Sequence, residues 1–150
     1  MSSVLTPLVL DLLKGVASDD TGVFTVVGAC YLDLDNLPFP AVKEILWRVI
    51  LESSSPAGGD QAVVDLFDTS GVLGAPDTVT DSELDNSGAA DQTVPEMFEV
   101  DLRQRLVGVA SGPGVFEARL KVFDAGGGAT VYCKSAQLIL VPAFQPPPII

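Results

Sequence analysis

The sequence has no histidine, and only two cysteines, one tryptophan and eight basic side chains among 150 residues. Without histidine there is no Ser-His-Asp or Cys-His base and no imidazole metal ligand. Two cysteines are too few to build a zinc site. The eight basic residues face 20 acidic ones, and the resulting formal charge of −12 repels nucleic-acid phosphates. We therefore expect a protein that is not an enzyme and that has no cofactor, no metal and no nucleic-acid partner.

The chain also lacks a long uncharged run. Charged residues interrupt each apolar candidate before it reaches the ~18 residues that a membrane helix needs. The N-terminus has no basic region, and Pro7 and Asp11 break its apolar stretch, so it makes a poor signal peptide. The positive mean hydropathy of +0.40 then indicates a β-rich core, and we expect no membrane partner.

Alternation of apolar and polar side chains with a period of two is the strongest positive signal. The run 45–51 is apolar on both faces apart from Arg48, which predicts a central strand packed on two sides. Residues 61–67 predict a further strand. The alternating segments are 24–34, 97–103, 115–123 and 136–141. In the first of these, the residues expected to share one face are Phe24, Val26, Gly28, Cys30, Leu32 and Leu34.

Turn sequences rich in Gly, Ser, Asp and Pro separate these segments. Six or more strands without helix-period segments between them predict an all-β fold, an antiparallel two-sheet β-sandwich of jelly-roll type. A parallel sheet would need crossover helices, which the sequence lacks. We place the β-sandwich domain at 23–143, between an N-terminal arm at 1–22 and a Pro-rich C-terminal arm at 144–150.

The N-terminal arm supports two interpretations. Its leucines and Val9 follow the i, i+3, i+4 spacing of a helix, with Thr6 as N-cap, Pro7 as the first helical residue and Gly15 as C-cap. These signals predict a short helix over 7–14, but the same residues also fit an edge strand. In either form the segment is too apolar to be left in water.

Both arms lie outside the predicted sandwich, and such arms usually stay dry by packing on a neighbouring subunit. The net charge keeps free subunits apart before assembly. We therefore expect a homo-oligomer. The residues expected to contact a partner are Leu5, Leu8, Leu12, Phe144, Pro147, Ile149 and Ile150.

Three groups of side chains are candidates for chemical sites. Cys30 and Cys133 lie in apolar strand-like segments, which favours buried free thiols over a disulfide between the first and last core strands. Glu99 and Asp101 share one strand face, roughly 6.5–7 Å apart, but every polar strand face generates such pairs, so we expect no catalysis. Asp81 and its neighbours resemble a calcium loop only superficially, because the sharp-turn glycine and the bidentate acid are missing.

Few aromatic side chains are available for binding a sugar. Trp47 sits in the doubly apolar strand and is expected in the core. Tyr31 and Tyr132 are then the main candidates, together with the acidic, irregular stretch 72–96.

The segments 39–52, 64–68, 116–120 and 136–140, with Gly71, resemble the small jelly-roll domains of tailed-bacteriophage virion proteins. These are head decoration proteins, fibres and tail components; similar patterns occur in sugar-binding jelly rolls. The resemblance extends over about residues 24–141 and carries no site residue. It implies a non-enzymatic structural protein of a virion, assembled in the host cytoplasm with itself and other virion proteins. The alternative is a carbohydrate-binding or receptor-binding β-sandwich module.

Overall fold

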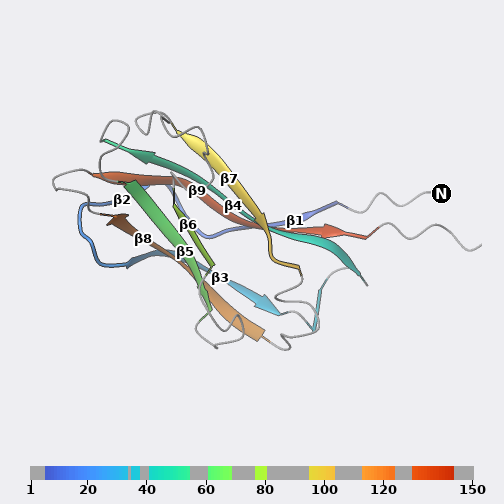
Figure 1. The fold of residues 1–150 in the computed structure, drawn as a ribbon. Coiled ribbons are helices and arrows are strands. Elements are labelled where there is room, and N and C mark those ends of the chain that lie inside the picture. Colours follow the sequence, from blue (N-terminus) through green and yellow to red (C-terminus); the bar gives the residue numbers. More distant parts are fainter. Residues whose placement is uncertain are drawn as a thin grey trace, which may run out of the picture.

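The computed structural model describes residues 6–33, 35–37, 41–54, 61–68, 77–80, 95–103, 113–123 and 130–143. These residues form nine β-strands in two layers (Figure 1). The described part of the chain contains no helix that is long and apolar enough to cross a membrane. The strands are β1 (Leu8–Asp11), β2 (Ala17–Asp19), β3 (Thr25–Asp33), β4 (Val42–Ser53), β5 (Gln61–Asp68), β6 (Asp77–Thr80), β7 (Glu96–Asp101), β8 (Pro113–Phe123) and β9 (Val131–Pro142).

The strands form two antiparallel sheets. The five-stranded sheet has the order β1-β9-β4-β7, with β2 also paired to β9, and the four-stranded sheet has the order β3-β8-β5-β6. Every connection from β2 to β9 crosses between the sheets except that from β5 to β6. With β1 and β2 taken as two parts of one interrupted edge strand, eight strands in this order form a double-sheet jelly roll. The predicted all-β sandwich is confirmed.

The core lies between the two sheets and is supplied by alternate residues of the long strands. On β4, Ile45, Trp47 and Val49 are fully buried and face the interior. The intervening Leu46, Arg48 and Ile50 are only half-buried on the outer face. The run is therefore central in its hydrogen bonding, between β9 and β7, but the prediction that both of its faces are packed in the core is wrong.

A β-bulge in β3 changes which side chains point inward. The register with β8 shifts between Val26 and Gly28, so two successive residues lie on the bulged side. Val27 packs against the core, whereas Val26 is 50% exposed. The expectation that Phe24 and Val26 share the face of Cys30 and Leu32 is wrong, because the inserted residue interrupts the period of two. Leu34 lies outside the described residues.

The N-terminal segment belongs to the sandwich. Leu8–Asp11 forms a strand that pairs with β9, and the backbone N–H of Leu12 donates to the carbonyl of Ala136 at 2.9 Å. Of the two interpretations of 7–14, the edge strand is confirmed and the helix is wrong. Residues 8–19 belong to the sandwich and not to an arm outside it. The edge of β9 offers backbone partners to this segment, and pairing with them buries Leu12 to 3% exposure.

The two layers approach each other closely at one point. A Cβ built on Gly28 of β3 would lie 1.7 Å from the carbonyl oxygen of Leu12, which follows β1. No side chain fits this gap, so glycine is needed for the close approach of the two backbones. Leu12, which follows β1 of the five-stranded sheet, therefore contacts the inner side of β3 at Gly28.

Candidate interaction surface

The outward-facing side chains of β3 and β8 carry an exposed apolar strip. Tyr31 is 62% exposed and lies directly opposite Val115, which is 41% exposed. Val26 lies on the same outer side, opposite Arg119. Cross-strand pairs of an aromatic and a β-branched residue stabilise the two strands that they join. We call Val26, Tyr31 and Val115 the β3–β8 strip.

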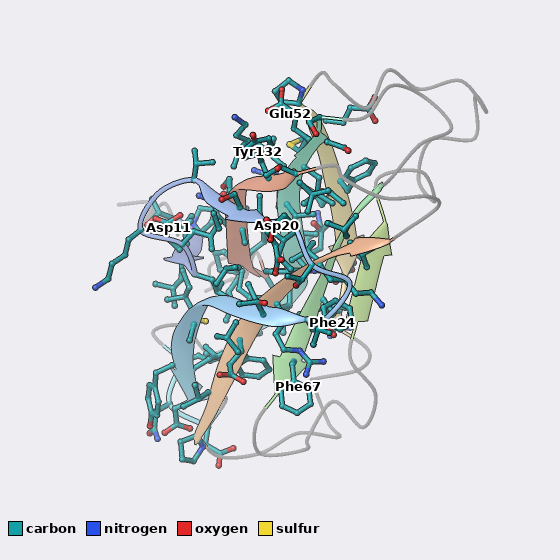
Figure 2. All side chains as sticks on the ribbon, turned by 90° about the vertical axis from the view of Figure 1, so that its left-hand side faces the viewer. Asp11, Asp20, Phe24, Glu52, Phe67 and Tyr132 are labelled. Carbon is teal, nitrogen blue, oxygen red and sulfur yellow. The ribbon has the colours of Figure 1, made fainter. Side chains whose placement is uncertain are left out.

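Beside this strip, an ion pair and two aromatic rings form a compact cluster on the outer side of the four-stranded sheet. Asp65 of β5 is 1% exposed and accepts two hydrogen bonds from Arg119, at 2.8 Å from Nε and 2.5 Å from Nη2. The Arg119 guanidinium lies 4.1 Å from the ring centroid of Phe67 and 5.1 Å from that of Phe24 (Figure 2). The ammonium of Lys121 lies 4.4 Å from the Phe24 ring. We call this group the Arg119 cluster.

The Arg119 cluster is built for stability. The hydrogen bonds that Arg119 donates to Asp65 raise the pKa of Arg119 further above its usual range, so the guanidinium stays charged. Its planar face contacts both rings, and its fork meets both carboxylate oxygens, an arrangement that lysine cannot reproduce. The charges of this buried pair are thus matched within the chain.

The outer side of the five-stranded sheet is crossed by a polar row. Asp11, Gln137, Arg48 and Glu99 lie opposite one another on β1, β9, β4 and β7. Gln137 donates to Asp11 at 2.7 Å, and Arg48 forms an ion pair with Glu99 at 2.6 Å. These groups pair with one another, so the middle of this outer side is polar.

The carboxylates weighed as a catalytic pair have structural partners. Glu99 is engaged by Arg48, while Asp101 accepts from the backbone N–H groups of Ile45 and Arg103 at 3.2 and 2.9 Å. Across the described ranges, no group of three or more Cys, Asp or Glu residues is placed to hold a metal ion. The calcium-like loop around Asp81 lies outside the described residues.

The candidate sugar-binding aromatics are not brought together. Tyr31 lies on β3 of the four-stranded sheet, and Tyr132 lies half-buried on β9 of the other sheet, opposite Glu52 (Figure 2). Trp47 is fully buried, as predicted, and its indole Nε1 is a buried donor without a partner in the part of the chain that the structure describes. Most of 72–96 lies outside the described residues.

Both cysteines are free, as the interpretation as thiols predicted. They belong to different sheets, Cys30 to β3 and Cys133 to β9. Burial raises the pKa of the Cys30 thiol to about 11 and that of Cys133 to about 12. The thiolate is the reactive form of cysteine, so both thiols are inert at neutral pH.

Thiol chemistry should therefore be slow in the folded protein. At pH 8 a pKa of about 11 leaves on the order of 0.1% of Cys30 as thiolate, so we expect a disulfide reagent to label native protein at least ~100-fold more slowly than unfolded chain. The measurement is the absorbance of released thiolate with and without denaturant, and Cys30→Ser isolates the signal of Cys133. Rapid labelling of native protein would contradict the assignment.

The predicted partner contacts divide into two groups. Leu8 is half-buried on β1, and Leu12 is a core residue of its own subunit. Leu12 is therefore unavailable to a partner, because its side chain is already buried within the sandwich. The remaining predicted contacts lie outside the described residues: Leu5, Phe144, Pro147, Ile149 and Ile150.

Comparison with known proteins identifies no family. No family model and no curated protein matches the chain. Among solved structures, dimeric latent PorU from Porphyromonas gingivalis aligns with 87% of this chain at a TM-score of 0.33 and 12% identity. This chain covers only 13% of that PorU chain. A structure of Desmodium yellow mottle tymovirus aligns with 99% of this chain, at a TM-score of 0.27 and 10% identity. The match covers 89% of the tymovirus chain. The assignment to the jelly-roll β-sandwiches rests on strand order alone.

Proposed function

We propose that the protein is a non-enzymatic structural protein of a viral particle, which assembles through surfaces of its β-sandwich. The observation that carries the proposal is the β3–β8 strip, an exposed apolar surface beside an edge strand on a chain of net charge −12. Exposed apolar surface that is contiguous is typical of contact sites with other proteins. The inert thiols and the structural partners of Glu99 and Asp101 agree with a role outside catalysis.

The virion part of the proposal is supported by the resemblance of the sequence to jelly-roll domains of tailed-bacteriophage particles. On this proposal the protein is a head decoration, fibre or tail component, assembled in the host cytoplasm with other virion proteins. β1 and Leu12 are part of the sandwich itself, so the described N-terminal residues are not among the proposed contacts. The β3–β8 strip takes their place.

The mass of the purified protein in solution tests the proposal. We expect light scattering at moderate ionic strength to give a multiple of 15.6 kDa, since salt at 0.15 M shortens the reach of charge repulsion to about 8 Å. A 15.6 kDa species over the whole accessible concentration range would count against self-assembly.

The Pro-rich C-terminus provides a second test. We expect deletion of Gln145–Ile150 to lower the oligomer mass or the amount bound to particles, because the segment ends in two apolar isoleucines. The thermal unfolding of the sandwich should be unchanged. Equal assembly of the truncated and full chains would remove the C-terminus from the proposed contacts.

A carbohydrate-binding module is the second candidate, and the 62% exposure of Tyr31 is the observation that favours it. A glycan array separates the two functions. Saturable binding to one glycan class, lost in Tyr31→Ala, would favour the carbohydrate-binding module over the structural role.

A further inference from the structure

We propose that the free edge of β3 pairs antiparallel with β3 of a second copy, so that two four-stranded sheets become one continuous sheet across a two-fold axis. The inference rests on the proposed structural function and identifies one contact through which two copies would associate. Such an isologous pairing uses the same surface of both copies and is the commonest way in which soluble homodimers form.

The backbone of β3 is suited to this pairing. β3 has nine residues and pairs with β8 on one side, and no described strand pairs with it on the other. A strand at the edge of a sheet presents a row of N–H and C=O groups that can accept another strand. The bulge lies at Val26/Gly28, near the start of the strand, and the register with β8 is regular from Gly28 to Asp33.

Charge distinguishes β3 from the other long edge. Natural edge strands are commonly protected by charged side chains. β7 carries three acidic residues, Glu96, Glu99 and Asp101, whereas residues 25–32 of β3 carry none. On a chain of net charge −12, β3 is therefore the long described edge at which two copies meet with the least repulsion.

The two-fold geometry also fits the one carboxylate of β3. Antiparallel pairing of a strand with its own copy brings the start of one strand beside the end of the other. Asp33 of one copy then lies near Thr25 of its partner, which is neutral. The same operation centred on Glu99 of β7 would place Glu99 opposite Glu99 of the second copy, and like charges placed opposite each other destabilise a sheet.

The side chains beside this edge add apolar surface to the contact. Tyr31 and Val26 stand on β3 itself and are 62% and 50% exposed. In a paired sheet each would lie alongside the neighbouring copy's strand, where cross-strand neighbours are about 4.5–5.5 Å apart. Pairing would thus remove apolar area from water while it satisfies the backbone of the edge.

The test compares three substitutions that each add one negative charge. Tyr31→Asp and Val26→Asp place a carboxylate beside the β3 edge, twice in a symmetric contact. Met97→Asp is the matched control on β7 of the other sheet, at 59% exposure. We expect the two β3 variants to raise the dissociation constant on the order of tenfold or more, with the control unchanged, because like charges at an interface strongly disfavour association. Light scattering over a concentration series measures this, and circular dichroism verifies that each variant folds.

The outcomes separate this inference from the proposed function. A wild-type monomer at every concentration overturns both. A wild-type oligomer that neither β3 variant weakens overturns the β3 contact and leaves self-assembly standing. Equal dissociation by all three variants also overturns it, since added charge alone would then be the cause. In the supporting case, amide hydrogen exchange in β3 is slower in the oligomer than in monomeric Tyr31→Asp, while exchange in β7 is the same.

Discussion

Gly28→Ala is expected to destabilise the protein by about 3 kcal/mol or more, a large effect for one added methyl group in a packed interior. The new Cβ would lie 1.7 Å from the Leu12 carbonyl oxygen and 2.6 Å from its carbonyl carbon. Backbone atoms cannot rotate away as the end of a side chain can, so β3 or the residues after β1 must move. Denaturant unfolding followed by the fluorescence of the single, buried Trp47 measures the change.

Gly15→Ala is the matched control for this prediction. A Cβ at Gly15 meets nothing within 4 Å, and the residue lies in the exposed connection between β1 and β2. We expect it to leave stability unchanged or to raise it by about 0.4–1 kcal/mol, because alanine has fewer unfolded conformations than glycine. Equal effects of the two substitutions would contradict the close approach at Gly28.

β7 and β8 were predictable from the sequence because each keeps an uninterrupted period of two. Phe98 and Leu102, and likewise Phe116 and Leu120, are buried as that alternation predicts. One face of such a strand must leave water, so the pattern is imposed by burial and can be read locally. The two-sheet sandwich followed from the number of predicted strands and from the turns between them.

The N-terminal segment could not be assigned locally. Residues 8 and 12 lie on one side under both a helical and an extended pattern, since a separation of four is close to one helical turn and is also an even number of strand residues. Thr6 and Pro7 are compatible with either form. The extended form results from pairing with β9, which lies more than 100 positions further along the chain and whose edge accepts β1 and β2.

The Arg119 cluster was missed because its charged partners are 54 positions apart and both lie on strand faces that point away from the core. A charge at an outward position is ordinarily solvated. One signal was available in the sequence. Asp65 interrupts an apolar run, Val63-Val64-Asp65-Leu66-Phe67, and an acid surrounded by apolar side chains requires a cation if it stays ionised. Phe67 in the same run offers a ring on which a guanidinium could stack.

Asp65→Ala is expected to lower the free energy of unfolding by about 3 kcal/mol, because it leaves Arg119 held between two aromatic rings without its anion. Arg119 is 22% exposed and keeps some contact with water, which places the effect at the lower end for broken buried pairs. Thermal or denaturant unfolding with Trp47 as the probe measures the loss. The exposed pair of Arg48 and Glu99, each 35% accessible, supplies the matched control, and Glu99→Ala should cost less than about 1 kcal/mol.

A double-mutant cycle distinguishes the ion pair from the packing around it. Asp65→Leu together with Arg119→Met removes both charges and keeps apolar volume beside Phe24 and Phe67. We expect this double variant to be more stable than Asp65→Leu alone, since replacing both partners removes the uncompensated guanidinium. If the effects of the two substitutions on the free energy of unfolding were additive, Asp65 and Arg119 would act independently. The ion pair would then not explain how a carboxylate is tolerated at 1% exposure. A favourable coupling would instead show that the outer side of the four-stranded sheet is held by a charge pair, next to the strip proposed for assembly.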